Sequence, residues 1–399
     1  MKRTDPDLIV ESSALYPPLS GVGYYTLGLL KSYGALPDHY PVKILAYRFF
    51  LKRGRNPQEE HLADLAASLG ASLELRRRPF PSLVYARLRR LGLRLPLPVD
   101  LFRPRRRTLY FFPNFVGEPL LRSRCVPLIH DFGFLHFPDR LQGRDHLLLK
   151  RYLPRTLKRA SRVVVNSNRT KKELQDAYGI PPEQIAVVHP AVDHDTFCPD
   201  VPEAQGLAVR RKYELDGAYL FSLSTLEPRK NFSRLIEAYA LLPEGVRKRF
   251  ALVVAGGQGW KNEDITATLG RLGLESRIKF LGYIPEEDRA PLMRDAELFV
   301  LPSLDEGFGI PVLEAMACGT PVVTSARGAL PEVGGDAVVY ADPLRPESIA
   351  DGILSVLENP NFRQELSKAG AARAAAFQWT VSARALADVF QRAAEESGE

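Results

Sequence analysis

The sequence predicts an α/β protein of two domains, each built on a doubly wound parallel sheet. Three observations support this fold class. At 399 residues the chain is longer than one domain of about 100 to 200 residues. Hydrophobic residues make up 45% and charged residues 25%, which are values of a folded globular protein. Short β-branched runs alternate with amphipathic segments throughout, as expected when helices cover parallel sheets.

Strand candidates occur in both halves of the chain. In the first half they lie at 8–11, 42–47, 108–112, 126–130, 162–166 and 185–189. In the second half they lie at 219–224, 250–255, 278–282, 297–301 and 321–324. Three helical stretches follow, at 346–357, 361–377 and 381–394, and no strand is expected among them. We expect the last helix to pack back across the domain junction.

The two halves differ in charge. Residues 1–205 contain 32 Lys and Arg against 20 Asp and Glu, a net charge of +12, whereas the remainder contains 22 against 27, a net charge of −5. The sign changes at segment 199–206, which is rich in proline and acid and has no periodicity. We therefore predict a first domain at 1–205, a second at 206–378 and a C-terminal helix at 379–399.

Apolar runs and cysteines indicate the compartment. The N-terminus opens with charged residues, and no apolar run approaches the roughly 18 residues that a membrane span needs. Cys125, Cys198 and Cys318 are far apart and lack C-x-x-C spacing, so neither a disulfide framework nor a zinc site is expected. The sequence therefore predicts a protein of the reducing cytoplasm.

The most informative segment follows the strand candidate at 297–301. This strand ends at Pro302, a glycine-containing loop comes next, and Pro311 stands in the first turn of a helix that Gly319 closes. Backbone amides at such a helix N-terminus suit a phosphate or sugar oxygen, because the helix dipole is positive there. The amides in question belong to Gly307, Phe308, Gly309 and Ile310.

Two carboxylates flank this anion site. Glu306 precedes the loop amides, and Glu314 lies one turn into the helix. Carboxylates offer several acceptor positions and so suit the hydroxyl groups of a sugar and a ribose. As an isolated pair, Glu306 would be a solvated loop acid and Glu314 an ordinary acid near a helix N-terminus.

Residues 302–323 resemble the Glu-x7-Glu motif of the retaining glycosyltransferases of family four, which have the GT-B fold. The resemblance extends over most of the chain. It implies two Rossmann-like domains facing a cleft, with the acceptor on the N-terminal side and the nucleotide-sugar in the C-terminal domain. It also implies that Glu306 contacts the transferred sugar, that the loop amides contact sugar and phosphate, and that Glu314 holds the ribose. No cofactor is implied.

A basic pair follows the first strand of the second half. Arg229 and Lys230 stand at the carboxyl edge of the predicted sheet, where open α/β folds bind ligands. Arginine can grip phosphate oxygens through two hydrogen bonds and lysine adds a point charge, although such a pair in a loop is commonly a solvated surface. The resemblance implies a diphosphate clamp. The commoner family pattern is Gly-Arg-Leu-x-x-x-Lys-Gly, and this chain has Ser224, Thr225 and Asn231 in place of its first glycine, its arginine and its last glycine. The role of the arginine is therefore assigned to Arg229, and Thr225 stays a donor-site candidate.

The first half supplies further candidates. Gly21 and Gly23 follow the first strand and resemble the family's glycine loop over the donor phosphates, with a tight turn as the alternative. His130 ends the strand at 126–129, where the family places a histidine beside the transferring sugar. Its role is open between orienting a sugar hydroxyl and supporting developing positive charge through its backbone carbonyl. Asp193 and Asp195 have the spacing of a metal-binding D-x-D, but no further oxygen ligands cluster near them in sequence, so no metal is expected.

A basic tract spans residues 76–107. Its arginines are Arg76, Arg77, Arg78, Arg87, Arg89, Arg90, Arg94, Arg103, Arg105, Arg106 and Arg107, with Asp100 the only acid between them. Apolar residues interleave with these arginines, which predicts an amphipathic helix on an anionic membrane or a phosphorylated acceptor. The alternative is a solvated face whose arginine stems cover apolar surface. The family resemblance favours the inner membrane. Nucleic acid is not expected, because no nucleic-acid-binding motif accompanies the charge.

The two motif segments most resemble the mannosyltransferase-like branch that builds O-antigen or exopolysaccharide, which implies GDP-mannose as donor and a glycan or lipid-linked acceptor. A UDP-glucose-type donor remains an alternative, and the base is expected to bind near Gly282 and Tyr283. A GT-B fold epimerase would share the architecture. A non-enzymatic sugar-nucleotide-binding protein is disfavoured because the paired glutamates and the Arg-Lys clamp are all present. The expected activity is therefore metal-independent hexosyl transfer.

Overall fold

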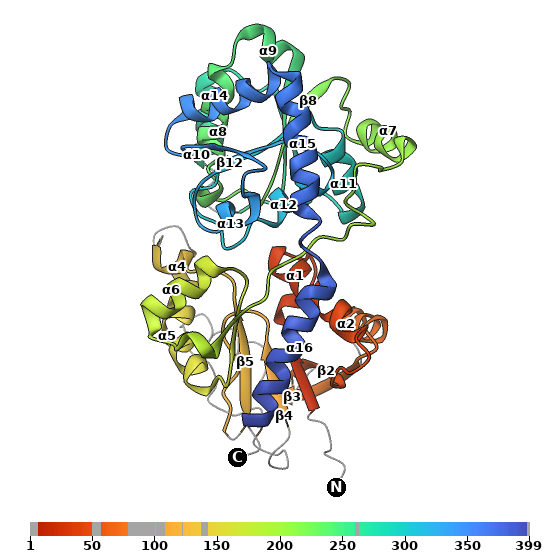
Figure 1. The fold of residues 1–399 in the computed structure, drawn as a ribbon, viewed down its shortest axis with the longest axis vertical. Helices are drawn as coiled ribbons and strands as arrows, with labels where there is room; N and C mark the ends of the chain where they lie inside the picture. Colours follow the sequence, from red (N-terminus) through yellow and green to blue (C-terminus); the bar gives the residue numbers. More distant parts are fainter. Residues whose placement is uncertain are drawn as a thin grey trace. The chain divides into compact units, whose positions relative to one another are not determined.

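The computed structural model describes residues 7–49, 57–78, 100, 108–121, 123–136, 143–259 and 263–396. These residues form two compact units (Figure 1). The first comprises Met1–Pro190 with Trp379–Glu399, and the second comprises Ala191–Gln378. Each is an α/β unit with an all-parallel sheet, which confirms the predicted fold class. Among the described helices, none is both long and apolar enough to span a bilayer.

The sheet of the first unit has seven strands in the order β3-β2-β1-β4-β5-β6-β7. The strands are β1 (Asp7–Glu11), β2 (Val42–Phe49), β3 (Ser72–Arg78), β4 (Thr108–Phe112), β5 (Arg124–Ile129), β6 (Val163–Val165) and β7 (Ile185–Val187). Three consecutive residues of β1, from Leu8 to Val10, are fully buried, as expected for a parallel strand covered on both faces. The strand order reverses between β1 and β4, so ligands are expected beyond the carboxyl ends of these strands.

Helices cover both faces of this sheet. They are α1 (Gly21–Gly34), α2 (Pro57–Ser68), α4 (Gly133–His136), α5 (Gly143–Arg159), α6 (Asn168–Tyr178) and α16 (Trp379–Glu396), with short 3-10 turns η1 (Ser13–Leu15) and η3 (Pro182–Gln184). The sequence fixes α6 at both ends. The hydroxyl of Ser167 accepts a hydrogen bond of 3.1 Å from the Thr170 amide, and Gly179 ends the helix at a φ of 63°.

The C-terminal helix α16 belongs to the first unit, in agreement with the predicted fold. It packs against α1 and the sheet (Figure 1). Gly28 of α1 permits this contact, because a Cβ atom there would lie 2.5 Å from the ring of Trp379. Phe390 packs edge-on against Tyr33 and Phe111, each with ring centroids 5.3 Å apart. The end of the chain therefore completes the core of the first unit.

The sheet of the second unit has six strands in the order β10-β9-β8-β11-β12-β13. The strands are β8 (Ala218–Leu223), β9 (Phe250–Ala255), β10 (Ile278–Gly282), β11 (Leu298–Leu301), β12 (Val322–Ser325) and β13 (Val339–Ala341). The surrounding helices are α7 (Glu203–Lys212), α8 (Phe232–Leu241), α9 (Glu244–Arg249), α10 (Glu263–Leu272), α11 (Glu286–Arg294), α12 (Ile310–Ala317), α13 (Leu330–Gly334), α14 (Pro346–Leu357) and α15 (Pro360–Ala374), with the 3-10 turn η4 (Pro228–Lys230). Here the order reverses between β8 and β11.

Two strands were not predicted. The edge strand β3 pairs only with β2 and ends in Arg76, Arg77 and Arg78, because an exposed edge tolerates charged residues that hide the strand pattern. These three arginines, at the start of the basic tract, therefore lie on a strand and not in the amphipathic helix that was expected for part of that tract. The remaining arginines of the basic tract lie outside the described residues. The other missed strand, β13, has three residues and is an edge strand of the second sheet.

The predicted linker is also not wholly irregular. Helix α7 begins at Glu203, inside the segment 199–206. The structure divides its units after Pro190, ahead of the boundary expected at residue 205. Residues just after this point belong to the second unit by their contacts: the Val192 amide donates to the Phe377 carbonyl, and the guanidinium of Arg289 lies 5.6 Å from the ring centroid of Phe197. Such contacts between distant residues cannot be predicted from composition, which is why the expected boundary lies too late in the chain.

Candidate active site

Two loops meet at the carboxyl edge of the second sheet. One follows β8 and carries Arg229 and Lys230 in the turn η4, and the other follows β11 and carries Glu306. The strands β8 and β11 are neighbours at the point where the strand order reverses, which is where open α/β folds bind ligands. The amide of Leu304 donates a 2.8 Å hydrogen bond to the Arg229 carbonyl, which ties the two loops together.

Glu306 is the centre of a buried cluster of charges. The ammonium of Lys230 lies 2.6 Å from its Oε1, and Nη1 of Arg229 lies 3.4 Å from its Oε2. The hydroxyl of Ser303 donates to Oε1 at 2.8 Å, and Nη1 of Arg229 also donates to the Asp305 carbonyl at 2.9 Å. Both cations predicted as a diphosphate clamp are therefore in contact with the predicted sugar-binding carboxylate.

The charges set the ionisation of Glu306. The side chain is 6% exposed, and this burial by itself raises the pKa. The ammonium of Lys230 and the guanidinium of Arg229, with hydrogen bonds from Lys230 and Ser303, outweigh burial and hold the pKa of Glu306 below its usual range. Glu306 is thus a carboxylate at neutral pH, able to accept hydrogen bonds but not to donate a proton.

Asn231 holds the clamp in place and shows why it can replace the glycine of the commoner pattern. Its φ is 65°, in the left-handed region that glycine and asparagine tolerate best. Its side-chain amide donates to the carbonyls of Pro302 at 3.0 Å and Pro343 at 2.7 Å. Asparagine thus supplies both the conformation of the turn and a link between loops. Glu227, which the sequence did not single out, accepts from Nη2 of Arg229 at 2.8 Å and orients that guanidinium.

The glycine-containing loop leads directly into α12, as predicted. Gly309 is the N-cap, at a φ of 105°, and a Cβ atom there would lie 2.7 Å from Leu330. No side chain caps the helix at this position. The first amides of a helix have no partner within the helix, so they are suited to an anion. Gly328 packs closely against this loop, since a Cβ atom there would lie 2.3 Å from the Glu306 carbonyl oxygen.

Glu314 is buried in α12 and forms an ion pair with Arg289 of α11. Burial raises the pKa of Glu314 to about 7, and the guanidinium of Arg289 offsets only part of that effect. Arg289 is itself buried, at 8% exposure, and no local sequence pattern indicated that it would pair with the second glutamate. A site for a ribose at Glu314 would therefore depend on the position of Arg289.

The remaining candidates of the second unit lie at the same sheet edge. The amide of Gly256 donates to the Gly282 carbonyl at 2.7 Å, and the amide of Ser224 donates to the Ala255 carbonyl at 3.0 Å. Thr225 is exposed beside these contacts, and Tyr283 follows β10 with 52% of its surface exposed. The structure thus gathers Thr225, Gly282, Tyr283 and the clamp along one edge.

His130 directly follows β5 of the first unit and has aromatic neighbours. Its Nε2 lies 2.7 Å from the Pro113 carbonyl oxygen, which requires the proton on Nε2 and leaves Nδ1 as an acceptor. Its ring makes edge contacts with Tyr25 at 5.9 Å and Phe115 at 5.3 Å. Burial lowers the pKa of His130 below its usual value, despite the Pro113 contact. His130 is therefore a neutral imidazole at physiological pH.

Two glycines and an acidic pair complete the comparison with the sequence. Gly21 is the first residue of α1, and a side chain there would meet nothing within 4 Å. Gly23 is needed for packing, because a Cβ atom would lie 2.7 Å from the Ala14 carbonyl oxygen. Asp193 accepts hydrogen bonds from the Asp195 amide at 3.1 Å and the Thr196 hydroxyl at 3.0 Å, as in an ordinary turn. Within the described segments, no group of three or more metal-binding side chains was found.

Two family models match this chain. The model described as Glycosyltransferase Family 4 matches residues 20–196, and the model described as Glycosyl transferases group 1 matches residues 209–373. The O-antigen chain mannosyltransferase B of Escherichia coli is 33% identical over 385 residues, covering 93% of this chain and 96% of that protein. The serotype-specific mannosyltransferase WbdA of Escherichia coli is 31% identical over 276 residues, covering 69% of this chain but 33% of that longer protein.

Solved structures show the same fold. The crystal structure of HepE from Anabaena, in complex with UDP and glucose, superposes with a TM-score of 0.69 at 20% sequence identity. The match covers 97% of this chain and 99% of HepE. At this level of identity the likeness establishes the architecture, the two-domain GT-B fold.

Proposed function

Since this chain belongs to glycosyltransferase family 4, we propose that it transfers a hexose from a nucleotide-diphospho-sugar to a glycan or lipid-linked acceptor, with retention of configuration. The observation that carries this proposal is the contact of Glu306 with both Lys230 and Arg229 at the carboxyl edge of the sheet, beside the neighbouring strands β8 and β11. A carboxylate and two cations in contact suit a substrate that joins a neutral sugar to a charged diphosphate.

The clamp stabilises the leaving group in this mechanism. Breakage of the bond between sugar and diphosphate develops negative charge on the phosphate and positive charge on the sugar ring. Lys230, Arg229 and the first amides of α12 face the phosphate, where preorganised positive groups lower the barrier most. The diphosphate takes over hydrogen bonds that Lys230 and Arg229 otherwise give to Glu306, so the carboxylate is free to hold sugar hydroxyls.

The proposed retention of configuration is what the resemblance to the retaining glycosyltransferases implies. The acceptor enters on the face from which the diphosphate departs, and the departing phosphate accepts the acceptor's proton. Glu306 serves as a fixed acceptor that positions the sugar rather than as an acid, which agrees with its lowered pKa. The two side-chain cations supply the charge stabilisation, so we propose that the reaction needs no metal ion.

Glu314 and His130 have supporting roles in this proposal. Glu314 holds the ribose hydroxyls, with Arg289 fixing the orientation of its carboxylate. His130, as a neutral imidazole with Nδ1 available as an acceptor, orients a sugar hydroxyl; support of positive charge through its carbonyl remains the alternative. That carbonyl already accepts a 3.3 Å hydrogen bond from the Thr170 hydroxyl, which favours the imidazole as the active group.

We propose mannose from GDP-mannose as the transferred sugar and donor, in polysaccharide or O-antigen synthesis. The support is that two relatives, one of them matched over nearly its whole length, are named mannosyltransferases. A UDP-glucose-type donor is the second candidate, because the structurally similar HepE was crystallised with UDP and glucose. The proposed location is the cytoplasm, with peripheral contact to the inner membrane through the first unit.

A donor panel tests this proposal. Purified protein is incubated with GDP-mannose, UDP-glucose, UDP-galactose, ADP-glucose and dTDP-glucose, with and without EDTA, and nucleotide release and melting temperature are followed. We expect GDP and GDP-mannose to raise the melting temperature by mass action and GDP-mannose alone to be hydrolysed, unaffected by EDTA. A rise in melting temperature with UDP donors only would mean that the donor is a UDP-sugar and not GDP-mannose. Loss of turnover in EDTA that added magnesium restores would refute metal independence.

A further inference from the structure

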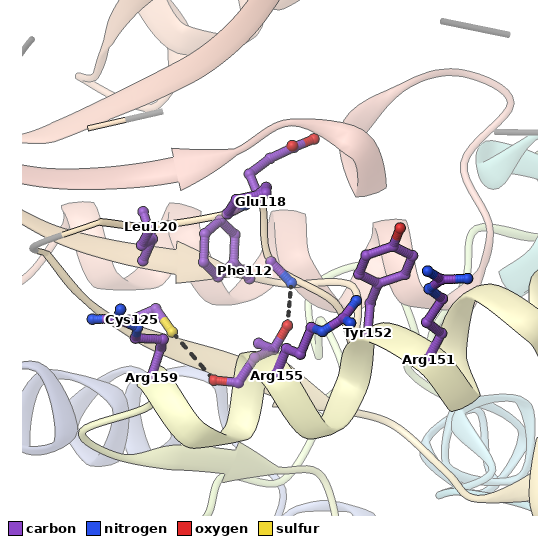
Figure 2. Close-up of a pocket in the computed structure, with 11 residues that line it drawn as sticks. Phe112, Glu118, Leu120, Cys125, Arg151, Tyr152, Arg155 and Arg159 are labelled. Atoms are coloured by element: carbon purple, nitrogen blue, oxygen red, sulfur yellow. Dashed lines mark hydrogen bonds between the residues drawn. The ribbon is translucent and has the colours of Figure 1, made fainter. Parts of the chain in front are cut away.

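A pocket distinct from the candidate active site lies in the first unit, on the face of the sheet that α5 covers. Its volume is about 450 Å³, within the range of about 300 to 1,000 Å³ for small-molecule sites. One wall is the C-terminal half of α5, and the other is formed by the end of β4, the loop that follows it and the start of β5 (Figure 2). None of the residues assigned above to sugar transfer lines this pocket.

Three arginines form its rim. Arg151, Arg155 and Arg159 are spaced four residues apart on α5, so they lie along one face of the helix, and all three line the pocket. The guanidinium groups of Arg151 and Arg155 lie 5.8 Å and 5.3 Å from the ring centroid of Tyr152. Arg159 donates to the Leu121 carbonyl at 3.3 Å. These contacts orient the side chains without neutralising their charge.

The floor of the pocket is apolar. Phe112, Leu120 and Cys125 line it, and they are 1%, 8% and 1% exposed. Burial raises the pKa of the Cys125 thiol to about 12, so this side chain stays neutral. One acid, Glu118, also lines the pocket, and its carboxylate points away from α5 in Figure 2. The site thus combines a positively charged rim with a neutral, largely hydrocarbon interior.

We propose that this pocket binds a phosphate or diphosphate ester that carries an apolar chain. The chain lies against Phe112, Leu120 and Cys125, and the phosphate is held by the arginines, whose planar groups form paired hydrogen bonds with phosphate oxygens. Neither free phosphate nor a plain hydrocarbon uses both parts of the site. Two sources have this chemistry: the lipid carrier of a glycan acceptor, and an anionic phospholipid of the membrane.

The acceptor role rests on the proposed function, whereas the binding itself does not. A carrier lipid held here would place the growing glycan on the N-terminal unit and restrain its motion, which reduces the entropy that the transfer step must overcome. This pocket also provides a structural basis for membrane contact that is independent of the basic tract at 76–107. The arginines of α5 were not part of that tract, and the sequence analysis did not identify them.

The test is direct binding to the full-length protein. Dodecyl phosphate, below its micelle-forming concentration, is titrated calorimetrically into the wild type and a variant with Arg151→Gln, Arg155→Gln and Arg159→Gln. The matched control carries Lys150→Gln, Lys158→Gln and Lys172→Gln, which removes the same charge from exposed positions that do not line the pocket. We expect the arginine variant to bind at least about tenfold more weakly and the lysine variant to bind within about twofold of wild type.

Two further ligands test whether the apolar floor of the pocket contributes to binding. Hexyl phosphate is expected to bind more weakly than dodecyl phosphate, and inorganic phosphate more weakly still, by at least about tenfold overall, because less chain is buried. Equal affinity for inorganic phosphate would overturn the apolar half of the proposal. No binding of dodecyl phosphate, or an equal loss in both variants, would overturn the pocket as its site.

Vesicles distinguish the two sources. Co-sedimentation is measured with phosphatidylglycerol vesicles and with phosphatidylcholine vesicles, with and without dodecyl phosphate. Competition by dodecyl phosphate, lost in the arginine variant, assigns the pocket to membrane phospholipid; specific dodecyl phosphate binding without competition assigns it to a lipid-linked acceptor. Binding to vesicles alone, with none to dodecyl phosphate, contradicts the proposal. GDP binding on the same samples should be equal in all three proteins, so a failure of the donor proposal remains separately visible.

Discussion

The ammonium of Lys230 lies 2.6 Å from Oε1 of Glu306, and the two residues are 9% and 6% exposed. Lys230 comes from the loop after β8 and Glu306 from the loop after β11, so two segments far apart in the sequence form one charged unit. Removing either partner leaves a buried charge without its closest counterion, which costs more than loss of an exposed ion pair. Substitutions at this site therefore need uncharged polar replacements and matched controls.

Lys230→Gln should weaken nucleotide binding. A charge-assisted hydrogen bond contributes about 1.5 to 3 kcal/mol, so the Kd for GDP is expected to rise by at least about tenfold, measured by calorimetry. Loss of the ammonium should also raise the pKa of Glu306, since Lys230 is the strongest of the groups that lower it. Lys248→Gln is the control, because its side chain is 63% exposed and pairs with Glu244, whose side chain is 71% exposed. A GDP affinity unchanged by Lys230→Gln would remove this residue from the clamp.

Gly328→Ala should damage the Glu306 loop by backbone overlap. The φ of Gly328 is 60°, and an added Cβ atom would lie 2.3 Å from the Glu306 carbonyl oxygen and 2.5 Å from its amide nitrogen. We expect donor turnover to fall at least about tenfold, because a displaced carboxylate no longer holds the sugar. Gly273→Ala is a close control, since its φ is 62° and a Cβ atom there meets nothing within 4 Å. It should cost about 1 kcal/mol of stability and leave turnover intact. Similar turnover in the two variants would count against the loop's role.

Glu314 should make the protein less stable as the pH rises through neutrality. Because burial raises its pKa to about 7, the folded state keeps this proton to a higher pH than the unfolded chain. The associated stabilisation is present in full below the ordinary glutamate pKa of about 4.3 and is lost as the pH rises through 7. The melting temperature of Glu314→Gln relative to that of wild type should therefore rise between about pH 5 and about pH 8. A shift in the opposite direction, or none relative to Glu347→Gln, would contradict this assignment.

Trp379 should anchor α16 to the first unit. Its indole stacks on the Tyr25 ring with centroids 6.1 Å apart and touches the position of Gly28. Trp379→Ala leaves a cavity between α16 and α1, and we expect a loss of about 2 to 4 kcal/mol in the free energy of unfolding, measured by calorimetry. Val381→Ala, two residues on and 58% exposed, should change it by less than about 1 kcal/mol. Comparable effects would show that α16 is not held at Trp379.

Much of the fold could be predicted because buried parallel strands have an obvious pattern. The strand β9 was predicted at its observed bounds, and the helix α14 likewise, because Phe250–Ala255 is continuously apolar and Pro346 marks a helix start. The strand β3 was missed because an edge strand is only half covered and accepts arginines. The start of α7 was missed because Pro202 and Glu203, which suggested a linker, are also residues that suit the first turn of a helix.

Some residues of the candidate site could likewise be predicted from the sequence and others could not. Glu306 and Gly309 could be proposed because they occupy a short segment in which a strand, a loop and a helix start follow one another, and Lys230 because it follows a strand in a second such segment. Their convergence, and the partners Ser303, Glu227 and Arg289, depend on which strands are neighbours, which local patterns do not determine. Asn231 looked like a departure from the family pattern, yet its positive φ shows that it fulfils the requirement of the glycine it replaces.

Glu306→Gln tests the proposed active site most directly. Hydrolysis of GDP-mannose and the Kd for GDP are measured for wild type, Glu306→Gln and the exposed-acid control Glu347→Gln. The prediction is that turnover falls about 100-fold or more in Glu306→Gln while GDP binds at least as tightly as in wild type, because the clamp loses the carboxylate that competes with the diphosphate. Turnover equal to that of Glu347→Gln would contradict the central role of Glu306 in sugar transfer.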